Sequence, residues 1–264
     1  MKILFIEKID KFSKIESILN KVKLKENKIK IYKDISITNI KNKRRIINKI
    51  KRILIKEKVD KVILSKEIKK DKEFINLLYS NSINTSDDRW LFKMLADEVI
   101  GKVIKNTKKQ ESELHITVNE LNNINQNIIY KFSKEFKRVN IITNHIGKFK
   151  KIAEELYEDG IIITVTNNKR KSLSKATLIL NIDFPKEILN QFQIFDKATI
   201  INLDGNMKIK KKRFEGKIIN DIEVKTFEDE ELLKFIEENN LDSYDIKDIC
   251  EVLNIVPKCD IILT

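Results

Sequence analysis

Residues 139–166 read VNIITNHIGKFKKIAEELYEDGIIITVT, and their order of elements decides the fold. The runs at 139–143 and 161–166 consist mainly of Ile, Val and Thr, which is typical of buried strands. Between them, residues 147–159 repeat apolar side chains at helical spacing, and Gly160 is a residue type that commonly ends a helix. A strand, a helix and a strand in so short a stretch predict a parallel pair joined by a crossover helix.

The same alternation continues on both sides of this stretch. The sequences HITVNE (115–120), TLILNI (177–182) and ATIINL (198–203) predict three more strands, with a helix at 125–137. Near-continuous runs of Ile, Val and Leu suit parallel strands that are covered on both faces. We therefore predict an α/β fold whose C-terminal part is a Rossmann-like, doubly wound and mostly parallel sheet.

The N-terminal part contains a second set of alternating elements. KILFIE (2–7), KIKIYKDI (28–35) and KVILS (61–65) predict strands, and the stretches between them have helical periodicity. The polar sequence NTKKQESE separates the two sets. The sequence thus predicts two α/β lobes, a basic lobe at 1–108 and a Rossmann-like lobe at 109–264 that carries acidic C-terminal helices.

Charge is unevenly distributed along the 264 residues, whose formal net charge is +13. Residues 1–58 hold 19 Lys or Arg and 6 Asp or Glu, a net charge of +13. Residues 221–251, with predicted helices at 228–239 and 243–253, hold 12 acidic residues and 3 lysines, a net charge of −9. Such polarity can steer an anionic partner or favour head-to-tail self-association. The pairing of these segments within one chain or between two is left open.

Arginine is the more informative of the basic residues. Ile, Lys and Asn supply 120 of the 264 residues and have AT-rich codons, so much of the lysine content reflects an AT-rich genome. Three of the seven arginines, Arg44, Arg45 and Arg52, fall in one predicted helix at 41–58. A guanidinium group suits phosphate, so this helix is a candidate for nucleic-acid or anion binding.

The sequence shows no pattern typical of a membrane span, a signal peptide, a phosphate-binding loop, a metal site or a disulfide framework. No stretch of 18 uncharged apolar residues occurs, and the first apolar run is too short for a signal peptide, so we expect a cytoplasmic protein without membrane contact. The five glycines form no phosphate-binding loop, and the two His and two Cys predict no metal site and no disulfide framework. Asp87 and Asp88 are interpreted as charges at a helix start, and Trp90 as a packing anchor.

Residues 139–204 resemble the nucleotide-binding half of shikimate dehydrogenase and glutamyl-tRNA reductase. In that group the second strand ends in Asn-Arg, where this chain has Asn144-His145, and the following helix closes with a glycine, here Gly160. SKATLILNIDFP (174–185) and DKATIINLDG (196–205) are similar to the group's next two strands. The resemblance implies a dinucleotide-binding sheet and an oxidoreductase-like activity.

The chain departs from this group at the turn that binds the cofactor. After the first strand the group has Gly-x-Gly-x-x-Gly or Ala, because glycine lets the backbone approach the pyrophosphate. This chain has Asn-Glu-Leu-Asn-Asn-Ile at 119–124 and no glycine between Gly101 and Gly147. We therefore expect that the Rossmann-like lobe has lost its cofactor turn, and we predict no cofactor.

Three functions follow from these observations. The leading hypothesis is a protein without catalytic residues that acts by binding, through a protein partner or self-association, because no acid, base or nucleophile constellation is found. The first alternative is a nucleotide- or small-ligand-binding, oxidoreductase-like protein that uses a strand-end pocket formed by Asn119, Asn144, His145 and Asn181. The second alternative is nucleic-acid binding through the basic helix at 41–58.

Overall fold

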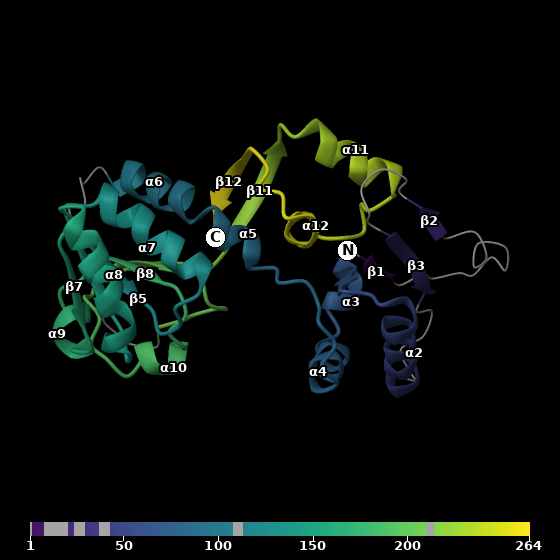
Figure 1. The fold of residues 1–264 in the computed structure, drawn as a ribbon, viewed down its shortest axis with the longest axis horizontal. Coiled ribbons are helices and arrows are strands. Elements are labelled where there is room, and N and C mark those ends of the chain that lie inside the picture. The colour runs from purple at the N-terminus through teal and green to yellow at the C-terminus, as the bar shows by residue number, and fades with distance from the viewer. Residues whose placement is uncertain (1, 8–20, 24–29, 37–42, 108–112, 210–213) are drawn as a thin grey trace. The chain divides into compact units, whose positions relative to one another are not determined.

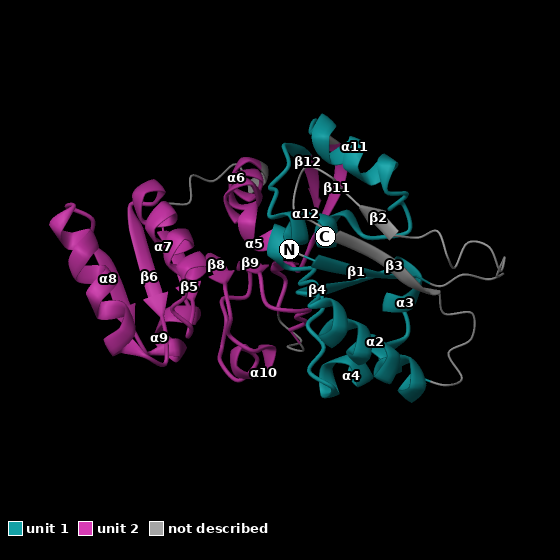
Figure 2. Ribbon diagram, turned by 45° about the vertical axis from the view of Figure 1, so that its right-hand side comes forward, with its two compact units in different colours: residues 1–91, 227–259 teal, residues 92–226, 260–264 magenta. Residues whose placement is uncertain are grey.

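The computed structural model describes residues 2–7, 21–23, 30–36, 43–107, 113–209 and 214–264. The chain divides into two compact units, unit 1 with residues 1–91 and 227–259 and unit 2 with residues 92–226 and 260–264 (Figure 2). These units differ from the predicted lobes, because 92–107 belongs to unit 2 and 227–259 to unit 1. The predicted boundary at 108–109 lies outside the described residues.

Unit 1 is built on a four-stranded sheet. The order across the sheet is β2 (Lys21–Lys23), β3 (Lys30–Ser36), β1 (Lys2–Glu7) and β4 (Lys61–Leu64). β1 is parallel to both of its neighbours, and β2 is antiparallel to β3. The helices of this unit are α2 (Lys43–Glu57), α3 (Lys66–Lys69), α4 (Lys72–Ser80), α11 (Glu230–Glu238) and α12 (Ile246–Leu253).

The two faces of the unit 1 sheet are covered by different segments. Leu4 and Ile6 of β1 and Val62 and Leu64 of β4 form one core cluster with Ile47 and Ile50 of α2 and with Phe74 and Leu78 of α4. Side chains alternate along a strand, so Phe5 faces the other way, where its ring meets that of Tyr244 at 5.0 Å between centroids. α12 contacts β4 on this second side. Figures 1 and 2 both show α2 and α4 on one side of the sheet and α11 on the other.

Unit 2 contains six strands that are all parallel. Their order across the sheet is β10 (Lys217–Ile219), β9 (Thr199–Asn202), β8 (Leu178–Asn181), β5 (Glu113–Thr117), β6 (Arg138–Ile142) and β7 (Ile163–Thr166). The chain builds outward from β5 in one direction through β6 and β7, and then in the other through β8, β9 and β10. These parallel strands and their helices confirm the predicted α/β class.

Helices follow most strands of unit 2. α7 (Asn123–Glu135), α8 (Ile146–Glu158), α9 (Lys169–Leu173) and α10 (Lys186–Leu189) follow β5, β6, β7 and β8, whereas α6 (Ala96–Thr107) precedes β5. α5 (Trp90–Met94) spans the division between the units, as do β11 (Ile222–Phe227) and β12 (Cys259–Leu263), which form a separate two-stranded sheet. Gly160 follows α8 with a φ of +77°, which confirms its predicted role at the end of that helix.

Both faces of the six-stranded sheet are buried at its central strands. Ile179 of β8 is paired with Ile200 of β9, and both belong to a cluster that contains Leu173 of α9 and Leu189 of α10. The next pair along the same strands, Leu180 and Ile201, points to the opposite face and is also fully buried. A sheet buried in this way presents only its edges and strand ends for function.

Candidate functional site

The carboxyl ends of the six parallel strands form one edge of the unit 2 sheet. Polar side chains occupy the same register on three adjacent strands there, because Asn181 at the end of β8 is paired with Thr117 of β5 on one side and with Asn202 of β9 on the other. All three side chains are buried. In open parallel sheets ligands bind outside these strand ends, so this edge is the first place to look for a site.

Asn181 uses its side-chain amide completely within the protein. Its Oδ1 accepts hydrogen bonds from Thr117 Oγ1 at 2.6 Å and from the backbone N–H of Phe184 at 3.0 Å. Its Nδ2 donates to Phe184 O at 2.9 Å and to Asn202 Oδ1 at 2.7 Å. An amide group offers two donor hydrogens and one acceptor oxygen with two lone pairs, so no hydrogen-bonding capacity remains for a ligand.

The amide network continues from Asn202 into the loop that follows β9. Asn202 Nδ2 lies within hydrogen-bonding distance of Asp204 O, Gly205 O and Asn220 Oδ1, at 3.0, 2.8 and 3.0 Å. Asn220 in turn accepts from the N–H of Met207 at 2.8 Å and donates to its carbonyl at 3.1 Å. These bonds fix the loop against the strand ends, which is a structural role.

A carboxylate occupies the turn between β5 and α7. Asp183, two residues beyond β8, accepts hydrogen bonds from the backbone N–H of Asn119 through Oδ1 and from that of Glu120 through Oδ2, both at 2.6 Å. Burial raises the pKa of Asp183, and the two N–H groups oppose this shift by stabilising the charged form. The negative charges of Glu120 and Asp204 raise the pKa further.

A second set of contacts joins the ends of β5, β6 and β7. Asn119 Oδ1 accepts a hydrogen bond from the backbone N–H of Asn144 at 3.0 Å. The ammonium group of Lys169, at the start of α9, donates to Asn144 Oδ1. The same ammonium lies 5.8 Å from the ring centroids of Phe184 and Phe192, within range of cation–π attraction.

The four residues of the predicted strand-end pocket therefore lie along one edge of the sheet, and three of them belong to two hydrogen-bond networks. Asn119 and Asn144 are directly bonded to each other, and Asn181 belongs to the buried network. His145 is exposed, its backbone N–H donates to Thr143 Oγ1 at 3.0 Å, and its side chain makes no capping bond to α8. His115 is buried within β5, away from this edge, and burial lowers its pKa.

The three arginines of the basic helix are exposed on α2, which spans Lys43–Glu57; positions 41 and 42 of the predicted helix lie outside the described residues. At 100° per residue, Arg44, Arg45 and Arg52 fall within about 100° of arc on the helix. Their guanidinium groups form no ion pair with any other residue that the structure describes. The buried residues of this helix, Ile47 and Ile50, lie on the opposite side.

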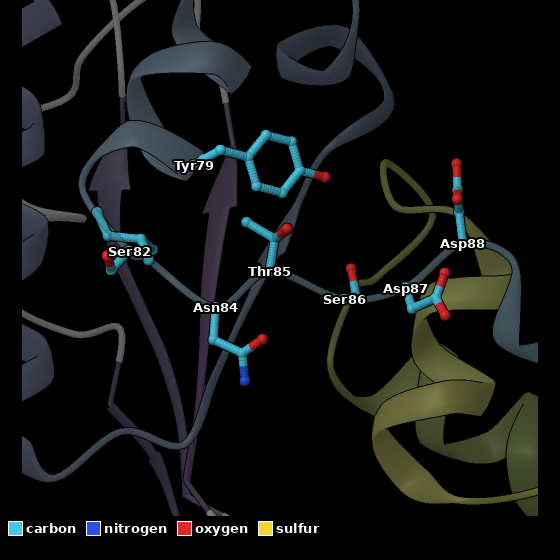
Figure 3. Close-up of a pocket in the computed structure, with 8 residues that line it drawn as sticks. Tyr79, Ser82, Asn84, Thr85, Ser86, Asp87 and Asp88 are labelled. Atoms are coloured by element: carbon cyan, nitrogen blue, oxygen red, sulfur yellow. The ribbon is translucent and has the colours of Figure 1, made fainter. Parts of the chain in front are cut away.

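Unit 1 contains a pocket of about 430 Å³ that is lined by residues between the end of α4 and the start of α5 (Figure 3). The segment 84–86 runs beside β4, since Val62 N donates to Asn84 O and Ser86 N donates to Val62 O, both at 3.0 Å. Asp87 Oδ1 accepts from the N–H of Arg89 at 2.9 Å, just before α5 begins. This bond agrees with the interpretation of Asp87 as a helix-start residue.

Two ion pairs join α12 to β4 and α3 within unit 1. Lys69 Nζ lies 2.6 Å from Oδ2 of Asp248, whose side chain is fully buried. Lys61 is paired with Glu251, whose side chain is 7% exposed. Burial raises the pKa of Asp248, whereas Lys69 lowers it. Each pair neutralises a carboxylate that would otherwise be buried with an uncompensated charge, so both are structural.

Sequence reasoning identified the polar strand ends but missed how they are connected. The roles of Thr117, Asn202 and Lys169 were not predicted. One signal was present: Asn181 and Asn202 each end a strand, and each is followed two residues later by Asp, at 183 and 204. This repeated Asn-x-Asp pattern indicates equivalent positions on neighbouring strands.

A scan of the chain against protein-family models gives no match, and a search of curated proteins gives none either. Among the residues that the structure describes, no group of three His, Cys, Asp or Glu side chains is placed to hold a metal ion. No helix within the described ranges is both long enough and apolar enough to span a bilayer.

Proposed function

We propose that this chain acts by binding a protein partner, without catalysis, and that its six-stranded sheet is a Rossmann-like fold whose cofactor turn is filled by Asp183. The observation that carries the proposal is the pair of hydrogen bonds from the N–H groups of Asn119 and Glu120 to the Asp183 carboxylate. The strand order, the chemistry of the edge and the charge of the turn support it.

The order of the strands supports a Rossmann-like sheet. If β5 to β10 are numbered one to six, the order across the sheet is 3-2-1-4-5-6, which is the order of dinucleotide-binding sheets. In such sheets the cofactor lies where the order reverses, here between β5 and β8, and its pyrophosphate binds the turn after the first strand.

The turn after β5 is unsuited to a phosphate group. A bound phosphate would need the two backbone N–H groups that already donate hydrogen bonds to Asp183. The negative charges of Asp183 and Glu120 would also repel it. The start of α7 is also satisfied, since Asn122 Oδ1 accepts from Asn125 N and Asn125 Nδ2 donates to Glu120 O, both at 2.8 Å. A carboxylate of the chain thus takes the place of the ligand anion.

The amide side chains along this edge do not suit acid–base catalysis. Asn119, Asn144, Asn181 and Asn202 carry amide groups, which do not ionise at neutral pH. The one ammonium group among them, that of Lys169, is held by Asn144 and by two aromatic rings. The chemistry of this edge therefore favours a protein that acts by binding a partner through its surface over one that acts by catalysis.

Isothermal titration of the wild-type protein with NAD and NADP tests the proposal. We expect no saturable heat of binding when either dinucleotide is titrated to millimolar concentration. Saturable binding of either one would overturn the proposal and move the oxidoreductase-like hypothesis to the front. Competition by inorganic phosphate would then show whether the turn after β5 is the site.

Replacing Asp183 with Ala should remove the carboxylate from the turn between β5 and α7. We expect a loss of about 2 kcal/mol in the free energy of unfolding, because two N–H groups lose a charged acceptor at a partly exposed site. We also expect inorganic phosphate to raise the melting temperature of Asp183→Ala and not that of the wild type, because a bound anion would replace the carboxylate.

The matched control is Asp204→Ala. Asp204 stands two residues beyond β9, as Asp183 stands two beyond β8, and its side chain is exposed. The free energy of unfolding of this variant should lie within about 0.5 kcal/mol of that of the wild type, and inorganic phosphate should not raise its melting temperature. A phosphate response shared by Asp204→Ala and the wild type would contradict the assignment of the turn to Asp183.

A further inference from the structure

The outer side of α2 presents a surface that combines positive charge with an exposed apolar residue. We define this basic face as Arg44, Arg45, Arg52, Lys56 and Ile55, all exposed. The Ile55 side chain is 80% exposed and lies between the guanidinium groups around the helix. Such a concentration of positive charge on one helix face can attract a partner that carries the opposite charge.

The outer side of α11 presents the opposite charge. We define this acidic face as Glu230, Glu231, Glu237, Glu238 and Leu233, all exposed, whereas Leu232 of the same helix is buried. Leu233 is 43% exposed. Lys234 lies 3.8 Å from Glu238, which neutralises one of the four carboxylates and leaves three.

The two faces belong to the same unit but lie on opposite sides of its sheet. The buried side of α2 packs on Leu4, Ile6, Val62 and Leu64, and the segment that includes Tyr244 covers the side of Phe5. Figures 1 and 2 agree in placing α2 and α11 on opposite sides of β1. The basic face therefore does not reach the acidic face of its own unit.

We infer that the basic face of one copy binds the acidic face of a second copy, so that the chain associates head to tail. This inference rests on the proposed binding function and names its partner. The two faces are complementary in charge, and each is a short helix surface with several like charges beside one exposed aliphatic side chain. Because the contact joins two different surfaces, it builds rings or open chains and not an isologous dimer.

The expected strength of this contact is modest and depends on salt. A single exposed ion pair contributes about 0–1 kcal/mol, so three such pairs and the burial of Ile55 against Leu233 give a reversible association. The Debye length is about 10 Å at 0.1 M ionic strength and about 3 Å at 1 M, so added salt should dissociate the copies.

The first test is the mass of the wild-type protein by light scattering across a concentration series. At an ionic strength of about 50 mM the mean mass should rise above the 31.1 kDa of one chain, and it should return to that value at about 1 M. A mass of 31.1 kDa at every concentration and low salt would overturn the inference.

Charge reversal separates this contact from general electrostatic effects. The variant Arg44→Glu/Arg45→Glu/Arg52→Glu and the variant Glu230→Lys/Glu231→Lys/Glu237→Lys should each weaken self-association about tenfold or more, which corresponds to about 1.4 kcal/mol. An equimolar mixture of the two should associate again, because each supplies a face that complements the other.

A control with the same change in net charge as the triple-arginine variant is Lys134→Glu/Lys148→Glu/Lys150→Glu, which alters exposed lysines of α7 and α8. It should associate like the wild type. Circular dichroism of every variant checks the fold. Failure of the mixture to associate while both variants remain folded would refute the pairing of these faces.

Heparin chromatography distinguishes a polyanion partner. If the wild type stays monomeric at low salt while its heparin retention depends on the three arginines, the basic face binds nucleic acid or another polyanion, and the self-association inference fails. That result would leave the titration with NAD and NADP unaffected, so the assignment of the cofactor turn to Asp183 and this inference can fail separately.

Discussion

Replacing Lys69 with Met is expected to lower the free energy of unfolding by about 3–5 kcal/mol at neutral pH, because it leaves a buried carboxylate without its counter-charge. Asp248 is fully buried, and the Lys69 ammonium 2.6 Å away is its ion-pair partner. Urea denaturation followed by circular dichroism measures the change. The double variant Lys69→Met/Asp248→Leu should recover most of the loss, since it removes both charges.

The same variant should change the dependence of stability on pH. Burial raises the pKa of Asp248 in the folded protein, and without Lys69 this pKa should rise further. A carboxyl group with a raised folded pKa binds its proton more tightly when folded, so it destabilises the protein as pH rises through that pKa. Lys69→Met should therefore regain stability relative to the wild type as the pH is lowered from 7.

The control is Lys234→Met, which removes one partner of the exposed pair with Glu238. Its free energy of unfolding should lie within about 1 kcal/mol of the wild type, because exposed pairs contribute little. Equal losses in Lys69→Met and Lys234→Met, or a loss in Lys69→Met that does not change with pH, would contradict the structural role of the Asp248 pair.

Replacing Asn181 with Leu is expected to cost about 4 kcal/mol of unfolding free energy, because it leaves several buried polar groups without partners at once. Asn181 makes four side-chain hydrogen bonds, to Thr117, to Asn202 and to both backbone groups of Phe184. Leu has nearly the same size and cannot replace any of these bonds. Thermal and urea denaturation would measure the loss.

The matched control for Asn181→Leu is Asn167→Leu. Asn167 follows β7 at the same edge of the sheet, and it is exposed. Its substitution should change the unfolding free energy by less than about 0.5 kcal/mol. If Asn181→Leu were as mild as this control, the buried amide network would not hold the strand ends, and Asn181 would have to be reconsidered as a ligand-binding residue.

The parallel strands of unit 2 were largely predictable because their burial leaves a clear pattern. The runs at 139–143, 161–166, 177–182 and 198–203 match β6, β7, β8 and β9 within a few residues. β5 ends at Thr117 and not at the predicted position 120, because Asn119 and Glu120 turn to meet Asp183. β10 has only three residues, too few for a pattern.

The connections between distant residues could not be predicted in the same way. The pairing of Lys61 with Glu251 joins residues 190 positions apart, and nothing in either local sequence indicates the partner. Asp183 stands two residues beyond a predicted strand, but its acceptance of hydrogen bonds from two N–H groups of another turn depends on the order of the strands in the sheet. Residue types were thus predictable, whereas their partners required the fold.

The composition of unit 1 from two separate stretches of chain has a consequence for synthesis on the ribosome. The first stretch ends at residue 91. Its contacts with the second stretch are Phe5 with Tyr244, Lys69 with Asp248 and Lys61 with Glu251. The second stretch emerges from the ribosome only after the whole of 92–226. Until then, one side of the sheet stays exposed to water and to chaperones. Unit 2 is contiguous but for its last five residues, so a nascent chain can form most of unit 2 before residues 227–259 of unit 1 are synthesised.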